Sequence, residues 1–256
     1  MMKLLSEVGA PLIFLSEILK TLFKKKISVK LVLEQIWSVA WNSLPTTAMA
    51  GFFVGAIMSV QFALQMKEFG ALGYLGGLAT SGTFREIGPL LIAFMLSGKV
   101  GAFTSAELGT MRVTEQIDAI RCLGADPLQE LIVPRFLGII ISSFFLLGLG
   151  LLMSVLGGAF LASLFVGVHV EEYLRHIPRI VQPASIVLGL IKCGSFALIL
   201  ATICTYKGFF ATGGAKGVGR AVVQTAVSTM ICIVVADWFT SFVGDVLVRL
   251  VIGEGA

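Results

Sequence analysis

Four ionisable side chains fall inside long apolar runs of the sequence, and they have the clearest chemical potential in the chain. They are Glu86, Lys99, Lys192 and Asp237. A charge at membrane depth costs about 2.5–3.5 kcal/mol on insertion scales, so such a residue usually faces a partner or a polar cavity. Lys192 and Asp237 lie deepest in their runs. We expect either that these two side chains pair with each other or that they line a cavity for an anionic head group.

Two of the four residues also have simpler explanations. Thr83 and Glu86 fit the spacing of a capping box, with Pro89 in the following turn, so Glu86 can simply begin a helix. Lys99 lies near one end of its apolar run, from which its long side chain can reach water. Lys192 is therefore the strongest functional candidate, with a purely structural role as the open alternative.

A polar segment, residues 107–135, separates two apolar runs and reads ELGTMRVTEQIDAIRCLGADPLQELIVPR. Helical spacing places Arg112 near Glu115 and Asp118 near Arg121, as pairs three residues apart on one helix. The segment is thus predicted to form a charged amphipathic helix at the membrane surface. It is either a docking helix through which a partner pushes on the spans or an ordinary solvated helix, and the pattern fits both.

A glycine-rich loop, residues 207–220, reads KGFFATGGAKGVGR and suggests phosphate binding at first sight. Neither the order G-x-x-x-x-G-K-[ST] nor G-x-G-x-x-G after a strand is present, so we expect a tight turn here and no nucleotide site. The sequence shows no nucleophile–base arrangement, and its four cysteines and two histidines lack metal-ligand spacing. We expect no catalytic residue, no metal and no cofactor in this chain.

The composition indicates that helices in a lipid bilayer hold these residues. The chain is 57% hydrophobic and 13% charged, whereas soluble domains carry about 25% charged residues. A membrane span needs about 20 mostly apolar residues. We therefore predict an all-α membrane protein of one domain, residues 1–256, with its transmembrane bundle in 44–250. The five predicted spans are at about 44–66, about 86–106, within 136–168, about 184–206 and about 222–247.

Residues 1–43 are predicted to form an interfacial helical region ahead of the bundle. Apolar residues recur at steps of three and four from Leu5 to Leu22, alternate with charged residues, and are followed by a run of lysines. Such a helix lies in the membrane interface with its basic end near anionic head groups. A helix packed on the rest of the protein is the alternative. Trp37 and Trp41 fit an interfacial approach to the first span.

The distribution of lysine and arginine predicts the orientation in the membrane. Residues 1–30 carry six of them, and 107–135 and 207–220 carry three each, against five on the opposite side. Because positive loops stay in the cytoplasm, the N-terminus, the 107–135 segment and the glycine-rich loop are predicted to be cytoplasmic. Five spans then place the C-terminus on the outside.

Three stretches of the sequence form long and specific motifs. They are TFREIGPLLIAFMLSGKVG at 83–101, AELGTMRVTEQIDAIRCLGADPLQELIVP at 106–134, and the glycine-rich loop at 207–220. Together they resemble the permease subunits of MCE-type ABC lipid transporters, the Mla (maintenance of lipid asymmetry) permeases and their chloroplast relatives. The resemblance covers essentially the whole chain. The chain departs from the usual family residues at Lys99 (arginine), Cys193 (serine), Ala197 (glycine) and Val222-Val223 (a threonine pair).

The resemblance implies an assembly as well as a function. Two permeases would form a homodimer in the cell inner membrane, with ATPase subunits that bind ATP and Mg²⁺ on the cytoplasmic side. A ring of MCE-domain proteins would meet the dimer in the periplasm. Phospholipid would pass between inner and outer membranes, in support of outer-membrane lipid asymmetry, with no nucleic acid involved. The permease itself would be non-catalytic.

The resemblance also implies roles for particular residues. Those that match the family's charged lipid-pocket positions, lining or supporting the pocket, are Arg85, Glu86, Lys192 and Asp237. The polar segment would contain the coupling helix that seats in the ATPase, with the residues Glu107, Arg112, Glu115, Asp118 and Arg121.

Two alternatives to this function stay open from the residues alone. A secondary transporter or channel would work in the same kind of helical bundle without an ATPase. A membrane-embedded lipid-modifying enzyme would also bind lipid, but the missing aspartate or histidine pairs around a span argue against it.

Overall fold

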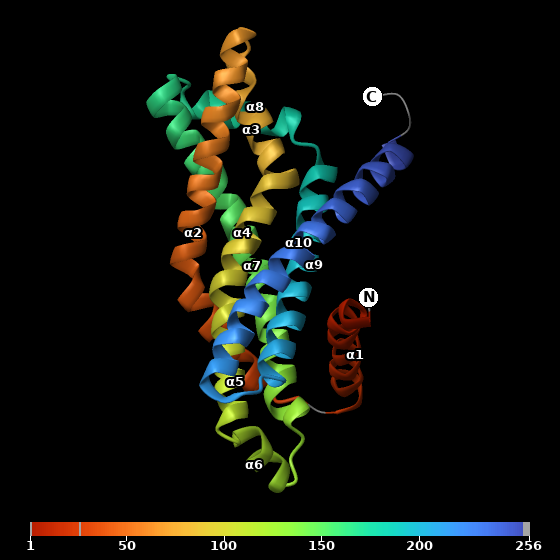
Figure 1. Ribbon diagram of the computed structural model, residues 1–256. Coiled ribbons are helices and arrows are strands. Elements are labelled where there is room, and N and C mark those ends of the chain that lie inside the picture. Colours follow the sequence, from red (N-terminus) through yellow and green to blue (C-terminus); the bar gives the residue numbers. More distant parts are fainter. Residues whose placement is uncertain (1, 26, 253–256) are drawn as a thin grey trace. The chain divides into compact units, whose positions relative to one another are not determined.

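The computed structural model describes residues 2–25 and 27–252, with side chains described for 9–25, 27–244 and 246. Every regular element in these ranges is helical (Figure 1). The α-helices are α1 (Met2–Lys24), α2 (Val29–Glu68), α3 (Leu75–Gly82), α4 (Gly88–Leu96), α5 (Ala102–Val113), α6 (Gln116–Cys122), α7 (Val133–Leu161), α8 (Val170–Ile180), α9 (Pro183–Phe209) and α10 (Gly214–Ile252). A 3₁₀ turn, η1 (Leu72–Tyr74), and four π-helical turns, η2 (Thr83–Ile87), η3 (Ser97–Gly101), η4 (Leu128–Ile132) and η5 (Ala162–Val166), connect or extend them.

The prediction of an all-α protein with five spans is confirmed for the part of the chain that the structure describes. Five helical segments are long and apolar enough to cross a membrane: Val29–Glu68, Leu72–Val113, Leu128–Val166, Pro183–Phe209 and Gly214–Gly244. The helices extend beyond the predicted spans, because a helix continues through amphipathic flanks for as long as its backbone hydrogen bonds continue. The predicted interfacial approach around Trp37 is thus the first part of α2.

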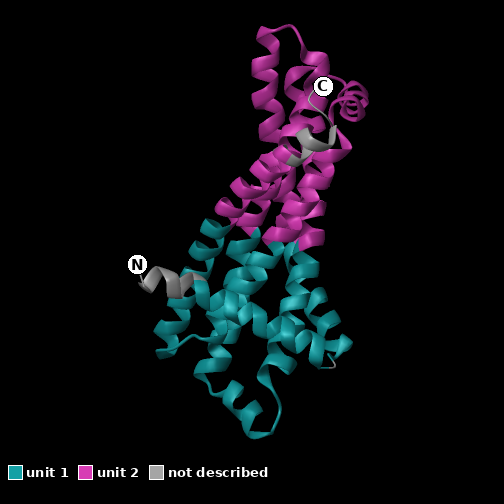
Figure 2. Ribbon diagram, turned by 90° about the vertical axis from the view of Figure 1, so that its right-hand side faces the viewer, with its two compact units in different colours: residues 1–43, 96–143, 197–232 teal, residues 44–95, 144–196, 233–256 magenta. Residues whose placement is uncertain are grey.

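The chain divides into two compact units, coloured separately in Figure 2. Unit 1 comprises residues 1–43, 96–143 and 197–232, and unit 2 comprises 44–95, 144–196 and 233–256. Helices α2, α7, α9 and α10 each contribute one part to either unit. The single domain expected from the sequence stays a prediction.

In unit 2, glycines allow the backbones of α2 and α7 to touch. A Cβ added at Gly51 would lie 2.1 Å from the carbonyl oxygen of Gly150, and one at Gly55 would lie 1.8 Å from that of Ser154. Gly51 and Gly55 form the G-x-x-x-G spacing that brings membrane helices into close contact through their small residues. Dispersion contacts between backbones then replace the hydrophobic effect, which is absent between helices in lipid.

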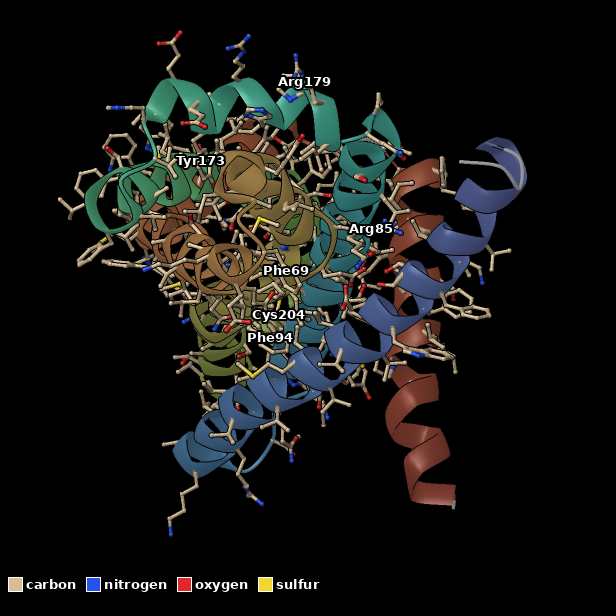
Figure 3. The ribbon with its side chains drawn as sticks, turned by 90° about the horizontal axis from the view of Figure 1, so that it is seen from above. Phe69, Arg85, Phe94, Tyr173, Arg179 and Cys204 are labelled. Atoms are coloured by element: carbon tan, nitrogen blue, oxygen red, sulfur yellow. The ribbon has the colours of Figure 1, made fainter. Side chains whose placement is uncertain are left out.

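The polar stretch between the third and fourth spans is the helix α8. Tyr173 points inward from it and is buried in an apolar cluster with residues of α2, α3 and α7 (Figure 3). A Cβ at Gly76 of α3 would lie 2.0 Å from the Tyr173 carbonyl oxygen, so these two helices also touch at the backbone. Burial raises the pKa of the Tyr173 phenol, which keeps this core side chain uncharged.

In unit 1, α1 packs on the last turns of α9. Phe14 and Ile18 are buried, and the Phe14 ring centroid lies 5.7 Å from that of Tyr206 and 5.6 Å from that of Phe210. Leu12, from the stripe predicted to lie in the membrane, is exposed, whereas the side chains of Leu5 and Val8 lie outside the described residues. One face of α1 thus packs on protein, and its position in the interface stays a prediction.

Candidate functional site

Lys192 occupies the inward-facing side of α9 in unit 2. Its neighbours one turn away on the same helix, Leu188 and Phe196, are both buried, so helical periodicity directs the lysine into the same packed face. The Lys192 side chain is fully buried, with 0% of its surface exposed. A lysine in this position needs an acceptor for each of its N–H groups.

Each of the three N–H groups of the Lys192 ammonium has an acceptor. Nζ donates to the Arg85 carbonyl oxygen at 2.8 Å, to Glu86 Oε2 at 2.8 Å and to Ser241 Oγ at 2.7 Å. Asp237 Oδ1 lies 2.9 Å from the same nitrogen and forms an ion pair with it. Because the three protons already point elsewhere, this Asp237 oxygen receives no aligned hydrogen bond.

Pro89 explains why the Arg85 carbonyl oxygen is free to accept from a lysine. In an α-helix this oxygen would receive the N–H of residue 89, and proline has none. The chain here forms the π turn η2, in which the Gly88 N–H donates to the Thr83 carbonyl oxygen. Such π turns are frequent at functional sites. The proline thus leaves a backbone acceptor that Lys192 fills.

Ser241 joins Lys192 either to the Glu86 carboxylate or to the backbone of its own helix. Its hydroxyl accepts from Lys192 and has one proton of its own, which is within reach of Glu86 Oε2 at 3.0 Å or of the Asp237 carbonyl oxygen at 2.8 Å. Ser241 was not among the predicted residues. Its spacing of one helical turn from Asp237 is the signal that could have identified it.

The charged side chains of the site differ in their exposure to solvent. Lys192 is fully buried, the Asp237 side chain is 15% exposed and the Glu86 side chain is 43% exposed. Arg85 belongs to the same turn as Glu86 and lies beside α9 and α10 (Figure 3). The two cations and two anions are formally neutral together, and Glu86 is the end of the cluster that another molecule can reach.

The structure thus brings together the four residues predicted from the family resemblance, and it confirms the pairing of Lys192 with Asp237. The alternative explanation of Glu86 as a helix-capping residue is wrong. Thr83 lies inside a continuous helical stretch, and its hydroxyl donates to the Ala79 carbonyl oxygen one turn back. The capping-box spacing is met without a helix start because the residues before Thr83 are themselves helical.

The second predicted site, the polar segment of unit 1, is not one continuous helix. Helix α5 ends at Val113, and Glu115 adopts the left-handed conformation with φ +61° before α6 begins at Gln116. Since this break turns Glu115 out of the helical register, the predicted Arg112–Glu115 pair is wrong. Arg112 Nη1 instead binds both carboxylate oxygens of Asp118, at 2.8 Å and 2.9 Å.

Asp118 is the centre of this segment's charges. It also accepts from Arg121 Nη1 at 2.9 Å, which confirms the predicted pair three residues apart. The Asp118 side chain is 45% exposed. Glu115 is exposed and has no ion-pair partner among the residues whose side chains are described. The segment therefore offers charged groups to the solvent at the point where its backbone bends.

Glu107, the remaining predicted residue of this segment, binds a partner that the sequence pattern did not indicate. Arg135 Nη2 donates to Glu107 Oε1 at 2.8 Å, and the Arg135 side chain is only 7% exposed. Arg135 lies in the first turn of α7, within the next span Leu128–Val166, so this ion pair joins the two ends of the polar segment. A separation of 28 residues has no helical periodicity that would reveal it.

A further ion pair anchors the segment to the N-terminal part of unit 1. Lys25 Nζ donates to Asp126 Oδ2 at 2.7 Å. Burial raises the pKa of the Asp126 carboxyl, but the Lys25 hydrogen bond, the Leu128 N–H and the charges of Lys25 and Arg121 outweigh it and hold this pKa below its usual 3.8. Within the described side chains, no group of three or more His, Cys, Asp or Glu is arranged to hold a metal ion.

The chain is similar in sequence to proteins of one kind. The family model described as "Permease MlaE" matches residues 32–243. A Rickettsia conorii protein named "probable ABC transporter permease protein" is 32% identical over 236 residues, a match that covers 92% of this chain and 91% of that protein. A Synechocystis protein of the same description is 32% identical over 217 residues, which is 85% of this chain and 82% of its own length.

A plant protein matches over a similar stretch. The Arabidopsis thaliana chloroplast protein TRIGALACTOSYLDIACYLGLYCEROL 1 is 30% identical over 229 residues, 90% of this chain and 65% of its own length. The five apolar helical segments and the family match over most of the chain agree with the resemblance seen in the sequence. This chain belongs to the MlaE permease family and is a permease subunit of an ABC transporter.

Proposed function

We propose that this permease moves phospholipid, as the membrane subunit of an ATP-driven transporter between the inner and outer membranes. The observation that carries the proposal is the fully buried Lys192 with two carboxylates among membrane-spanning helices. Ionisable groups at membrane depth usually mark a substrate path. The lipid in the name of the Arabidopsis relative and the MlaE family match support a lipid substrate.

A phospholipid suits the graded polarity of the Lys192 site. Its acyl chains need apolar helix surface, and its head group needs a few charged partners at one end. Glu86 and Arg85 form the accessible end of the cluster, and Lys192 holds Glu86 from behind through a 2.8 Å hydrogen bond. In this role Glu86 and Arg85 contact the head group, whereas Lys192 and Asp237 set the position and charge of Glu86.

Energy for transport comes from ATPase subunits in this proposal. They bind ATP and Mg²⁺, so that the permease itself needs no cofactor and catalyses no reaction. The exposed charges around Asp118, held by Arg112 and Arg121, form the surface on which the ATPase seats. Because α5 leads from this segment into the second span, a push on the segment reaches the bundle. Net transport follows only if the two states of the bundle bind lipid with different affinity.

The remaining features of the proposal follow the family resemblance. The permease is a homodimer in the inner membrane, with a cytoplasmic N-terminus, a periplasmic C-terminus and a ring of MCE-domain proteins on its periplasmic side. The excess of lysine and arginine in residues 1–30, 107–135 and 207–220 supports this orientation.

Crosslinking and transport of a photoreactive phospholipid test the lipid site. The chain is reconstituted in liposomes with the ATPase and MCE-domain protein of its own organism, and Glu86→Gln is compared with the wild type. We expect at least about a tenfold loss of crosslinking and transport, since a charge-assisted hydrogen bond contributes about 1.5–3 kcal/mol. Glu172→Gln, which changes an exposed carboxylate of α8 in the same unit, is the matched control and should transport normally. Equal activity of all three proteins would refute the site.

Co-purification separates the proposal from a secondary transporter or channel. An ATPase subunit should purify with the wild-type chain, and transport should stop when ATP is replaced by a non-hydrolysable analogue. Transport that continues without any ATPase would favour the secondary transporter. Chemically altered lipid in the product would instead favour a lipid-modifying enzyme.

A further inference from the structure

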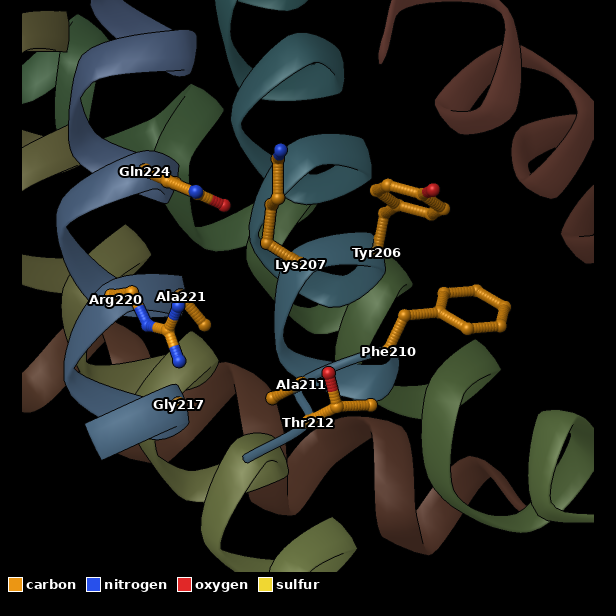
Figure 4. A pocket seen from close by; sticks show the side chains of 9 residues that line it. All are labelled: Tyr206, Lys207, Phe210, Ala211, Thr212, Gly217, Arg220, Ala221 and Gln224. Carbon is orange, nitrogen blue, oxygen red and sulfur yellow. The ribbon is translucent and has the colours of Figure 1, made fainter. Parts of the chain in front are cut away.

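A small cavity lies in unit 1 where α9 ends and α10 begins (Figure 4). It has a volume of about 260 Å³ and is open to the outside, with Arg220 and Gln224 exposed. Its lining residues are Tyr206, Lys207, Phe210, Ala211, Thr212, Gly217, Arg220, Ala221 and Gln224. Pockets for drug-sized ligands are roughly 300–1,000 Å³. The cavity therefore has room for a head group or a small ion and not for a whole lipid.

The charge at this cavity is positive and uncompensated. Lys207 and Arg220 line it, and neither has an ion-pair or hydrogen-bond partner among the side chains that the structure describes. The sequence contains no aspartate or glutamate from residue 173 to residue 236. In Figure 4 the side chains of Arg220 and Gln224 extend from α10 towards α9, from which Lys207 rises. Two cations that line one cavity without a paired carboxylate favour an anionic ligand.

The backbone at the cavity is shaped by glycines. Gly213 and Gly214 have φ of +96° and +65°, which reverses the chain between the two helices. A Cβ at Gly217 would lie 1.9 Å from the Thr212 carbonyl oxygen, and one at Gly213 would lie 3.3 Å from Arg220 Nη2. The turn thus lies directly against the first turn of α10 and against the guanidinium. The free N–H groups at the start of this long helix add positive potential at the same end.

The depth of the cavity indicates where its ligand comes from. Lys207 lies at the end of the span Pro183–Phe209, and Arg220 lies near the start of the span Gly214–Gly244. Both residues are thus close to an end of a candidate span, which suits a ligand at the membrane surface. A phosphodiester suits an arginine and a lysine, and the Gln224 amide supplies an additional donor.

We propose that this cavity is a binding site for a phosphate group, separate from the Lys192 cluster and independent of transport. Lys207 and Arg220 hold the anionic oxygens, and Gln224 completes the contacts. A lipid head group or soluble phosphate could supply the same chemistry. A bound head group at this position would join α10 to the last turns of α9, which also contact Phe14 of α1 and Arg121 of the polar segment.

Native mass spectrometry of the purified full-length chain in detergent tests the proposal. The probes are phosphatidylglycerol and a diacylglycerol with the same acyl chains, with inorganic phosphate as competitor. We expect phosphatidylglycerol to bind the wild type at least about tenfold more tightly than diacylglycerol, and the double variant Lys207→Gln/Arg220→Gln to lose this preference. Lys216→Gln removes an exposed charge of the same loop that does not line the cavity and should bind as the wild type does.

The outcomes distinguish the two sources and can overturn the site. Phosphatidylglycerol that stays bound in millimolar phosphate identifies the lipid as the ligand, whereas its displacement identifies soluble phosphate. Equal binding of the two lipids, or the same loss in Lys216→Gln as in the double variant, would refute the site. Glu86→Gln should leave this binding unchanged, so that failure of the lipid-transport proposal and failure of this one give different results.

Discussion

The protein has two charged clusters in which one central ion is paired with two ions of opposite charge, and the sign of the central ion differs between them. In unit 2 one cation, Lys192, is held by Glu86 and Asp237, and in unit 1 one anion, Asp118, is held by Arg112 and Arg121. Their surroundings differ, since Lys192 is fully buried and Asp118 is 45% exposed. The two clusters have the same number of ion pairs, but their different exposure to solvent gives them different roles.

The difference follows from what water can do when one partner is lost. Around Asp118, water solvates whichever charge remains, so exposed pairs contribute only about 0.2–1 kcal/mol each. Around Lys192, removal of one partner leaves buried charge without compensation, which costs about 3–5 kcal/mol. The buried cluster thus fixes a geometry among the helices, and the exposed one stays available to a partner.

The largest effect is expected from Lys192→Met. The variant removes the ammonium that pairs with Asp237, whose side chain is 15% exposed, and we expect a loss of about 3–5 kcal/mol in the free energy of unfolding. Thermal unfolding in detergent measures it. The triple variant Lys192→Met/Glu86→Gln/Asp237→Asn removes the orphaned charges and should recover much of the loss. A Lys192→Met protein as stable as the wild type would mean that solvent reaches the site.

A smaller but clear loss is expected from Arg135→Gln. Arg135 is 7% exposed, but its partner Glu107 is 41% exposed and can be rehydrated. We expect about 1–3 kcal/mol, as for a charged hydrogen bond, measured by the same unfolding assay. Glu107→Gln leaves the buried arginine without its anion and should cost about as much or more. If both variants unfold at the wild-type temperature, this pair contributes as little to stability as the exposed pairs around Asp118.

Asp118→Asn should change binding far more than folding. Loss of two exposed pairs is worth at most about 1–2 kcal/mol, and less at high salt. Retention of the ATPase subunit on an affinity column should nevertheless fall by at least about tenfold, because the surface that Arg112 and Arg121 present is reorganised. Glu34→Gln, an exposed carboxylate of α2 in the same unit, serves as control. Undiminished retention would leave the Asp118 cluster an ordinary solvated helix surface.

The smallest effect concerns the Lys25–Asp126 pair and depends on pH. Since the folded state lowers the pKa of Asp126 below 3.8, its stabilisation is fully present above that value and is lost as the pH falls through the lower folded-state pKa. The difference in melting temperature between the wild type and Asp126→Asn should therefore be constant from pH 7 to about pH 5 and vanish in stronger acid. A difference that grows on acidification would mean that folding raises the pKa of Asp126, which would contradict this prediction.

Much of the site was predictable where one helix carries both partners. The Asp118–Arg121 pair follows from a spacing of three residues, and the cost of charge in lipid identified Lys192 and Asp237 as unusual. The same reasoning failed at Arg112, because no local pattern shows that Glu115 takes a left-handed conformation and ends the helix. A helix is a local structure, and its breaks depend on the packing around it.

Composition and hydropathy are enough to predict a five-span helical membrane protein, because lipid requires long apolar segments whose backbone hydrogen bonds are all internal. The sequence also contains the motifs that resemble the permease family. Which charges meet is visible only in the folded chain, since Lys192 and Glu86 are 106 residues apart and Arg135 and Glu107 are 28 apart. Pairing over such distances depends on helix rotation and depth, which sequence periodicity within a single helix does not encode.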